Sequence, residues 1–374
     1  MGKGPHYLHE PFLGKKDSNS VSNAVLKKEV STYGNFVVKF EKEIKKFTKA
    51  KYSVALINCT QALFISLKAV GVKKNDEVLV PSLTFIGTVN AISYLDAEPH
   101  FVDSNIDDFG IDCQKLENYL KKITFKKKDK FYNKKTGKLI SAIVPVHVFG
   151  HPCKIEYIKK ISKKYNLKIV EDAAEALGSY YKNKHLGTFG HIGCLSFNGN
   201  KIITTGGGGV IITNNLKLYK RIKHLSSTAK VKHIWEYDHD DIGYNFRMPS
   251  LNASLGLAQM KQIKNFIKAK RSLYERYSKV FKNFNTVRVF KEKKYCKSNY
   301  WLQALVLEKN NFKLKKNILK LCYKNKIFVR PVWKLISSLK PYRNKQKMDL
   351  TGSKHIYKSV LNLPSSQKII LKRK

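Results

Sequence analysis

Acidic residues are scarce in this chain of 374 residues, which has 27 Asp and Glu against 72 Lys and Arg. The resulting formal net charge of +45 would suit a polyanionic partner, and nucleic acid is the first candidate. The lysines are nevertheless spread along the whole chain, and no helix-turn-helix, zinc-finger or RNA-binding signature accompanies them. A genome with AT-rich codons, which also enriches Asn, Ile, Tyr and Phe, is the explanation we favour. We therefore do not expect nucleic acid as a partner.

Long apolar runs and paired cysteines are also missing. No run of 18 apolar residues occurs, so no membrane-spanning helix and no membrane partner are expected. The first residues, MGKGPHYLHEPFLGKK, lack the apolar centre of a secretory signal. The six cysteines are scattered without a CxxC pair, which is typical of free thiols in a reducing compartment. These absences predict a cytoplasmic protein.

What is present indicates a large folded protein with two domains. Hydrophobic residues make up 43% of the chain, and strand patterns alternate with helix patterns through its first two thirds. Such alternation predicts an α/β fold with a doubly wound, mostly parallel sheet. We expect an irregular N-terminal arm over residues 1–35, a large domain over 36–248 and a small α+β domain over 249–374. The small domain should begin with one long helix that runs on from residue 250.

One stretch of the large domain brings chemically useful side chains together. An apolar run ends on acidic residues that include Asp172, and a second run, residues 192–197, leads to Lys201. A turn of four glycines, 206–209, precedes a third run at 210–212. Short apolar runs of this kind predict buried strands. A carboxylate and an amine should therefore emerge from neighbouring strand ends at one edge of the sheet.

Pyridoxal phosphate chemistry uses this pair of groups. A lysine amine forms a Schiff base with that cofactor, and a carboxylate keeps its pyridine nitrogen protonated so that the ring accepts electrons. Taken singly, Asp172 is more commonly a helix cap and Lys201 a surface residue. The string EDAAEA, followed by SFNGNK and ITTGGGG, resembles the sugar aminotransferases of the DegT/DnrJ/EryC1/StrS family. The resemblance extends from about residue 10 to residue 366.

The resemblance implies fold type I of the pyridoxal phosphate-dependent aminotransferases and a set of residue roles. Lys201 would hold the cofactor and act as the base that moves a proton during amino transfer. Asp172 would hold the ring nitrogen protonated through a charge-assisted hydrogen bond. Glu175 stands where many relatives carry Gln or His near the ring hydroxyl, and as a carboxylate it would only accept hydrogen bonds. Relatives that deoxygenate sugars carry histidine in place of the lysine, so Lys201 indicates amination.

The remaining roles concern the phosphate and the ring face of the cofactor. A strand that leads through a short polar turn into a helix offers free backbone N–H groups to a phosphate, and Cys59 and Thr60 occupy that turn. The resemblance adds Ser196 as a further phosphate ligand and Phe85 as the aromatic that stacks on the pyridine ring. Asn245, in the string GYNFRM, would reach the phosphate of the neighbouring subunit, which implies a homodimer with shared active sites.

The implied reaction moves an amino group from L-glutamate to a nucleotide-linked 4-keto-6-deoxyhexose. The product would be a 4-amino-4,6-dideoxy sugar for a surface glycan, and the branch that the chain resembles most serves the legionaminic acid pathway. The net positive charge would attract such an anionic nucleotide sugar. Amination at C3 and the choice between UDP and GDP stay open. Two further alternatives are a non-catalytic, basic nucleic-acid-binding homologue and a regulatory homologue that binds cofactor without turnover.

A cluster of histidines and acids over residues 233–241 invites a metal interpretation. No ligand spacing such as HExxH or an EF-hand loop supports it, so we expect no metal. The basic stretch over residues 125–138 should form an exposed hairpin or loop.

Overall fold

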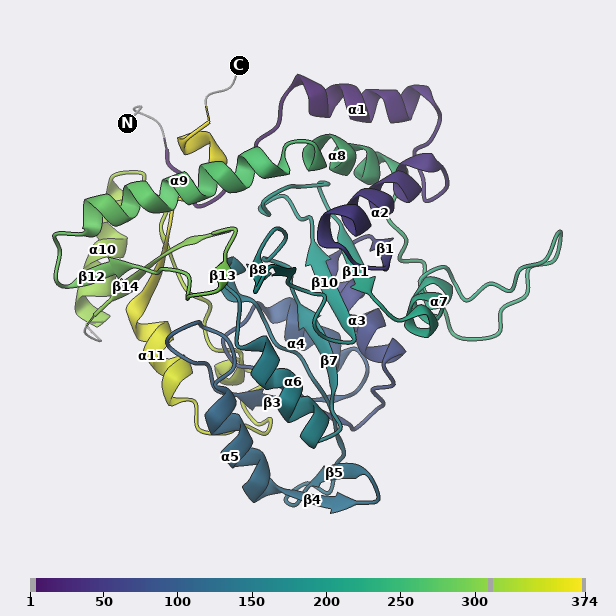
Figure 1. Cartoon of the computed structure of the whole chain (residues 1–374), viewed down its shortest axis with the longest axis horizontal. Helices are drawn as coiled ribbons and strands as arrows, with labels where there is room; N and C mark the ends of the chain where they lie inside the picture. Colours follow the sequence, from purple (N-terminus) through teal and green to yellow (C-terminus); the bar gives the residue numbers. More distant parts are fainter. Residues whose placement is uncertain (1–4, 309–311, 372–374) are drawn as a thin grey trace.

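A seven-stranded sheet forms the centre of the molecule in the computed structural model, which describes residues 5–308 and 312–371. Its strands are ordered β1-β11-β10-β7-β6-β2-β3. Figure 1 shows β11, β10 and β7 near the middle of the molecule. The strands are β1 (Tyr52–Leu56), β2 (Glu77–Pro81), β3 (Glu98–Val102), β6 (Ile140–Ile143), β7 (Lys168–Asp172), β10 (Ile192–Ser196) and β11 (Gly209–Thr213). The five strands from β10 to β3 are parallel, and only β11 runs antiparallel to both of its neighbours. The predicted mostly parallel sheet is confirmed.

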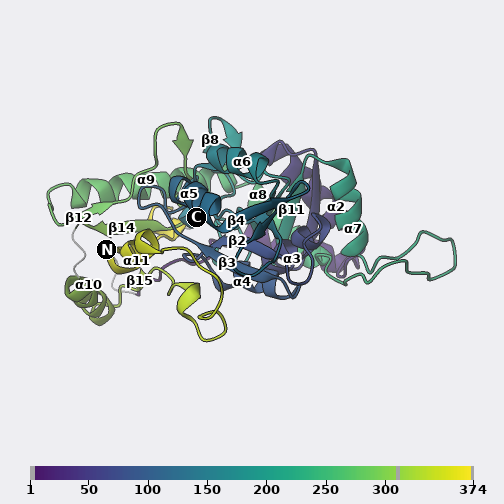
Figure 2. The same ribbon diagram turned by 90° about the horizontal axis from the view of Figure 1, so that it is seen from below.

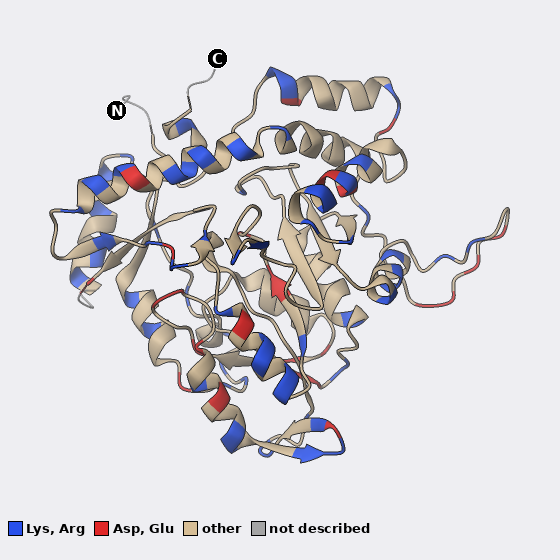
Figure 3. Cartoon of the chain, in the orientation of Figure 1, with Lys and Arg blue, Asp and Glu red and all other residues tan. Residues whose placement is uncertain are grey.

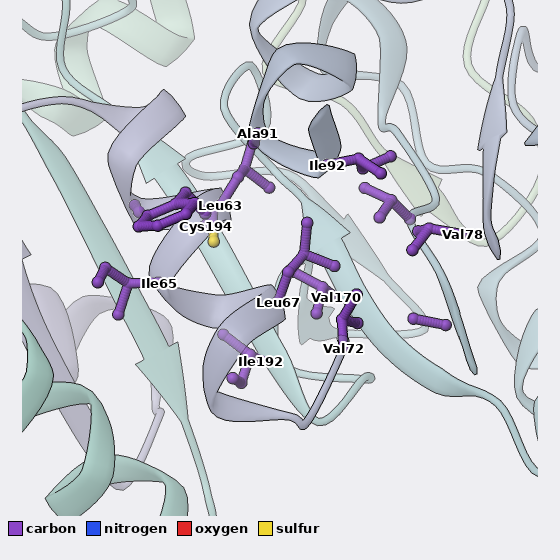
Figure 4. Close-up of a cluster of buried hydrophobic side chains, with 14 of the residues drawn as sticks. Leu63, Ile65, Leu67, Val72, Val78, Ala91, Ile92, Val170, Ile192 and Cys194 are labelled. Carbon is purple, nitrogen blue, oxygen red and sulfur yellow. The ribbon is translucent and has the colours of Figure 1, made fainter. Parts of the chain in front are cut away.

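Helices cover both faces of this sheet, as expected for a doubly wound fold. On one face lie α3 (Cys59–Ala69), α4 (Ile86–Ser93) and α7 (Leu216–Leu225). On the other face lie α5 (Cys113–Ile123), α6 (Ile155–Lys164) and α2 (Asn35–Thr48). Figure 4 shows the first core, in which Leu63 and Leu67 of α3 lie close to Val170, Ile192 and Cys194 of the sheet. Parallel strands that are buried on both faces have continuous apolar sequences, and for this reason they could be predicted from the sequence.

The N-terminal arm is not irregular throughout, and this corrects the sequence prediction. Residues Lys15–Leu26 form α1, in which the Asp17 carboxylate accepts a hydrogen bond of 2.9 Å from the Gly14 N–H. The helix lies on α8 (Ser250–Met260), and Ser20 Oγ donates to the Ser254 carbonyl at 2.7 Å. A short polar helix of this kind is stabilised by tertiary packing, which leaves little trace in the local pattern.

Two helices follow residue 249 where one was predicted. The helix α8 ends at Met260 and α9 (Ile263–Phe281) starts after Gln262. The side chains of Gln259 and Gln262 both donate to the Asp17 carboxylate, at 2.8 and 3.4 Å. Because this contact reaches α1, nearly 250 residues away, the apolar periodicity of the segment could not predict the break.

A four-stranded antiparallel sheet of order β12-β14-β16-β15 forms the β part of the small domain. The strands are β12 (Val287–Val289), β14 (Gln303–Leu307), β15 (Arg330–Pro331) and β16 (Val360–Leu363), and the helices are α10 (Phe312–Lys324) and α11 (Thr351–Ser359). Smaller elements are β4 (Thr124–Lys127), β5 (Lys130–Asn133), β8 (Tyr180–Tyr181), β9 (Lys184–His185), β13 (Cys296–Lys297) and the 3-10 turns Val148–Gly150, Ile336–Ser338 and Gln367–Ile369. Strands β4 and β5 pair as an antiparallel hairpin, as predicted for this stretch. In the described part of the chain, no helix is long and apolar enough to span a membrane.

Candidate active site

Seven of the eight predicted site residues line one cleft of about 350 Å³. These residues are Cys59, Thr60, Phe85, Asp172, Glu175, Ser196 and Lys201. The cleft lies at the carboxyl ends of β7 and β10, which is where ligands bind in open parallel sheets. Strand order thus brings together residues that are up to 142 positions apart in the sequence.

Lys201 enters the cleft from the loop that follows β10. Its side chain is only 12% exposed, and its Nζ lies 3.5 Å from Glu175 Oε1. The Nζ also lies 3.9 Å from the centre of the Trp301 ring, a distance at which an ammonium is attracted to the aromatic face. Trp301 Nε1 in turn donates to the Asn200 carbonyl at 2.7 Å, which ties the lysine loop to the small domain. The amine is therefore held by contacts from both domains.

Glu175 is buried, and its carboxylate accepts a hydrogen bond of 2.7 Å from the Phe149 N–H. Phe149 adopts a positive φ of 56°, a conformation that few non-glycine residues take, and this aims its N–H at the carboxylate. Burial raises the pKa of Glu175 to about 7, although the nearby Lys201 ammonium acts in the opposite direction. At neutral pH the side chain can therefore donate as well as accept a hydrogen bond, so it is not restricted to the acceptor role.

Asp172 is the last residue of β7 and faces the cleft. Its Oδ2 accepts a hydrogen bond of 2.6 Å from Thr88 Oγ1, and its Oδ1 accepts one of 3.1 Å from the Ala174 N–H. The preceding Glu171 points to the opposite side of the strand, where His147 and three backbone N–H groups bind its carboxylate. Of the two acids at this strand end, only Asp172 is available to a ligand.

The start of α3 supplies free N–H groups to the cleft. Asn58 caps the helix by accepting from the Gln61 N–H at 2.9 Å. The N–H groups of Cys59 and Thr60 belong to the first turn and have no acceptor within the helix. Burial, followed by the nearby Asp172 carboxylate, raises the pKa of the Cys59 thiol well above its usual value, so the thiol stays neutral.

Ser196 lies beside this helix start because of a glycine on the neighbouring strand. It pairs with Gly209 across β10 and β11. A Cβ atom on Gly209 would lie 2.5 Å from the carbonyl carbon of Asn58 and 2.7 Å from the Cys59 nitrogen. Only a glycine allows this close approach of β11 to the start of α3, and Ser196 lines the same cleft as Cys59 and Thr60.

Aromatic side chains form the wall of the cleft. Phe85 precedes α4 and remains 56% exposed, with its ring beside Gly87. Trp301 and Trp333 line the cleft as well, and sequence reasoning did not single them out, nor did it find Thr88. Nothing in the local sequence distinguishes Thr88 or the tryptophans from core residues, because their role depends on contacts with distant strands.

Asn245 is the predicted residue that does not line the cleft of its own chain. It is exposed and forms a bridge with Ser227 at the base of a segment, residues 229–247, that extends away from the body in both views (Figures 1 and 2). This segment also carries the cluster considered as a metal site. Within residues 5–308 and 312–371, no group of three or more His, Cys, Asp or Glu side chains is arranged to hold a metal ion.

The groups in the cleft suit pyridoxal phosphate. Two helix N–H groups and the Ser196 hydroxyl suit its phosphate, the buried Asp172 carboxylate suits a pyridinium nitrogen, and the Lys201 amine suits its aldehyde. The exposed ring of Phe85 offers a stacking face for the pyridine. When bound, this cofactor supplies an electron sink for the cleavage of bonds next to an amine.

Comparisons with known proteins identify the family to which this chain is similar. A family model described as the DegT/DnrJ/EryC1/StrS aminotransferase family matches residues 13–373. A GDP-perosamine synthase of Escherichia coli O157:H7 is 40% identical over 300 residues, which cover 80% of this chain and 77% of that protein. A UDP-4-amino-4,6-dideoxy-N-acetyl-beta-L-altrosamine transaminase of Campylobacter jejuni is 30% identical over 98% of this chain and 93% of its own length. The structure of Helicobacter pylori PseC, an aminotransferase involved in the biosynthesis of pseudoaminic acid, superposes with a TM-score of 0.87 at 25% identity, covering 96% and 94% of the two chains.

Proposed function

This chain belongs to the DegT/DnrJ/EryC1/StrS family of pyridoxal phosphate-dependent sugar aminotransferases, and we propose that it aminates a nucleotide-linked 4-keto-6-deoxyhexose at the expense of L-glutamate. The product is a 4-amino-4,6-dideoxy sugar for a surface glycan, and the legionaminic acid pathway remains the predicted destination. Two of the relatives above, a GDP-perosamine synthase and a UDP-linked 4-amino-4,6-dideoxy sugar transaminase, support a nucleotide-linked 4-amino sugar.

The observation that carries the proposal is the placement of Lys201, Asp172 and Glu175 in one cleft. Lys201 would hold the cofactor through its amine, and the same amine would take and return the proton at the carbon that carries the transferred amino group. Glu175 and Trp301 hold this amine inside the cleft. Asp172, fixed by Thr88 and Ala174, keeps the pyridine nitrogen protonated.

Glu175 assists at neutral pH because both of its protonation states are accessible. Its pKa of about 7 lies close to neutral pH, where a carboxyl can give or accept a proton near the ring hydroxyl at little cost. Cys59 and Thr60, with Ser196, bind the phosphate through two N–H groups and a hydroxyl. Phe85 stacks on the pyridine and fixes the plane of the ring.

The working unit is a homodimer in the reducing cytoplasm, and the partner completes each site. The exposed position of Asn245 on a segment that extends from the body is consistent with a role at the neighbouring cleft. A phosphate with nearly two negative charges benefits from several donors, and one more from a partner would add to the three of the cleft.

The direct test uses the purified protein with bound cofactor. Addition of L-glutamate should bleach the absorbance of the lysine-bound cofactor, and only a matching keto sugar should restore it. A panel of UDP- and GDP-linked 4-keto and 3-keto sugars then identifies the acceptor. Restoration by 3-keto sugars alone would favour the alternative reaction at C3.

Lys201 is tested by borohydride reduction and peptide mapping. The label should appear on Lys201, and Lys201→Ala should lower transamination by at least about 10³-fold because a covalent group and a proton carrier are lost together. Label on another lysine contradicts the assignment. A colourless protein whose binding to DNA depends strongly on salt would instead support the non-catalytic, nucleic-acid-binding alternative.

A further inference from the structure

A second functional surface lies at the end of the molecule that faces away from the cleft. Residues 121–138, which we call the lysine hairpin, comprise the end of α5, strands β4 and β5 and the chain that leads to β6. Nine of these 18 residues are lysine and only one, Asp129, is acidic. The whole chain has 72 basic residues in 374, so this segment is more than twice as rich in positive charge.

Most of these charges are exposed and have no carboxylate partner among residues 5–308 and 312–371. The eight exposed lysines are Lys121, Lys122, Lys126, Lys127, Lys128, Lys130, Lys134 and Lys135. Within the described part of the chain, only Lys126 among them forms a salt bridge, at 3.4 Å to Asp129, and both of these side chains are largely solvated. Like charges held this close repel one another, so an external polyanion would stabilise the arrangement.

The lysine hairpin is built into the fold. The buried Glu77 carboxylate accepts hydrogen bonds from Asn133 Nδ2 at 3.0 Å and from Thr136 Oγ1 at 2.5 Å, which fixes the base of the hairpin. At the turn, Asn166 Nδ2 donates to the Asp129 carbonyl at 3.0 Å. These contacts hold the backbone in place, so a ligand that binds the lysines need not order the segment first.

One face of the hairpin combines aromatic rings with positive charge. Phe125 pairs with Tyr132 across the two strands, and their rings stack 5.7 Å apart. Lys127 and Lys130 form the pair two positions further along, so they share this face. Phe125 is 41% exposed. Aromatic side chains beside several lysines suit the headgroup region of an anionic bilayer, where the rings enter the interface and the charges meet phosphate.

The position of the hairpin suits a flat surface. It precedes β6 and therefore lies near the amino end of that strand, whereas the cleft lies at the carboxyl ends of the parallel strands. Figure 3 shows lysines on α5, α6 and the hairpin at this end of the molecule. The rings of Phe125 and Tyr132 stack on each other, so little ring surface is left on which nucleotide bases could stack. This favours a bilayer over single-stranded nucleic acid as the ligand.

We propose that the lysine hairpin docks this protein peripherally on anionic phospholipid bilayers, with the cleft facing away from the membrane. A contact of this kind needs no spanning helix, because surface charge and interfacial rings suffice. The proposal is independent of the reaction, so the two can succeed or fail separately.

Vesicle flotation with the full-length holoenzyme tests the proposal. Wild-type protein should float with phosphatidylglycerol-containing vesicles and stay behind with pure phosphatidylcholine vesicles, and salt should weaken the binding. The variant Lys126→Gln/Lys127→Gln/Lys128→Asn/Lys130→Gln should bind at least about tenfold more weakly. Asparagine is chosen for Lys128 because that residue has a φ of 54°, which asparagine tolerates.

The matched control removes the same number of charges from α10, by changing the exposed Lys313, Lys316, Lys320 and Lys324 to Gln. This control should float like the wild type, and both variants should keep their transaminase activity. The proposal would be overturned if wild-type protein did not bind anionic vesicles. It would also be overturned if both variants lost vesicle binding to the same extent, because binding would then depend on net charge and not on the lysine hairpin. Hairpin-dependent binding to single-stranded RNA that is tighter than binding to vesicles would also overturn it.

Discussion

The Glu175 carboxylate and the Lys201 amine lie 3.5 Å apart in a cleft where both side chains are almost entirely shielded from water. Burial raises the pKa of Glu175 to about 7, against about 4.5 for an exposed glutamate. The folded protein therefore keeps a proton on Glu175 over a pH range in which the unfolded chain has already lost it. This difference links the site to the stability of the protein.

The first prediction is that Glu175 destabilises the folded cofactor-free protein as pH rises from about 4.5 to 7. Below pH 4.5 Glu175 is protonated in both the folded and the unfolded protein, so it does not destabilise the folded state. Above pH 7 it is ionised in both, and the destabilisation reaches its full size. Glu175→Gln should therefore gain up to about 3 kcal/mol in free energy of unfolding, relative to wild type, between pH 4.5 and 8. Denaturant unfolding of both proteins at several pH values measures this difference in free energy of unfolding. A control, Glu117→Gln, should show no such gain, because hydrogen bonds from Lys164 and Tyr157 lower the pKa of Glu117.

The second prediction concerns the contact between Asp172 and Thr88. Asp172→Asn should retain the cofactor through its phosphate but slow the half-reaction with glutamate by about 10- to 100-fold. This corresponds to the loss of one charge-assisted hydrogen bond, about 1.5–3 kcal/mol. Thr88→Ala should have a smaller effect, because the Ala174 N–H still binds the carboxylate. Stopped-flow absorbance measures both rates. Thr88→Ser, which keeps the hydroxyl, is the matched control, and equal rates in all variants would contradict the role.

The third prediction concerns the glycine turn. Gly209→Ala should destabilise the protein by about 1–3 kcal/mol and weaken cofactor binding, because the added Cβ would press on the start of α3. Gly207→Ala is the control for stability, since the nearest atom to its Cβ, the Ile57 carbonyl oxygen, lies at an ordinary distance of 3.6 Å. Thermal unfolding measures the stability of both variants, and only Gly209→Ala should be less stable than wild type. If both substitutions are tolerated equally, the close approach of strand and helix is not what the turn requires.

The fourth prediction tests the shared active site. Lys201→Ala and Asn245→Asp subunits should each be inactive alone, the second because a carboxylate repels the phosphate. After subunit exchange, half of the dimers are mixed, and in each of these one site has both intact residues. Activity should therefore recover to about a quarter of wild type. If the mixtures exchange subunits but stay inactive, the Lys201 and Asn245 that serve one active site must come from the same subunit.

Much of the fold and of the site could be predicted from the sequence because the relevant signals are local. Buried parallel strands such as β7 and β10 read as apolar runs, and the strings that contain Asp172 and Lys201 carry their resemblance within a few residues. The turn before α3 was predicted for the same reason. Seven of the eight expected residues then share one cleft because parallel strands end at the same edge of the sheet.

The tertiary structure alone decided which groups hold Asp172 and Lys201 in that cleft. Asp172 takes its hydrogen bond from Thr88, 84 residues earlier, and Lys201 meets the face of Trp301, 100 residues later. Asp17 in the arm likewise accepts hydrogen bonds from Gln259 and Gln262, which lie on either side of the break between α8 and α9. Such contacts form only when distant segments fold together. The strand and helix patterns record burial along the chain, whereas side-chain partners depend on distances in space that no local pattern encodes.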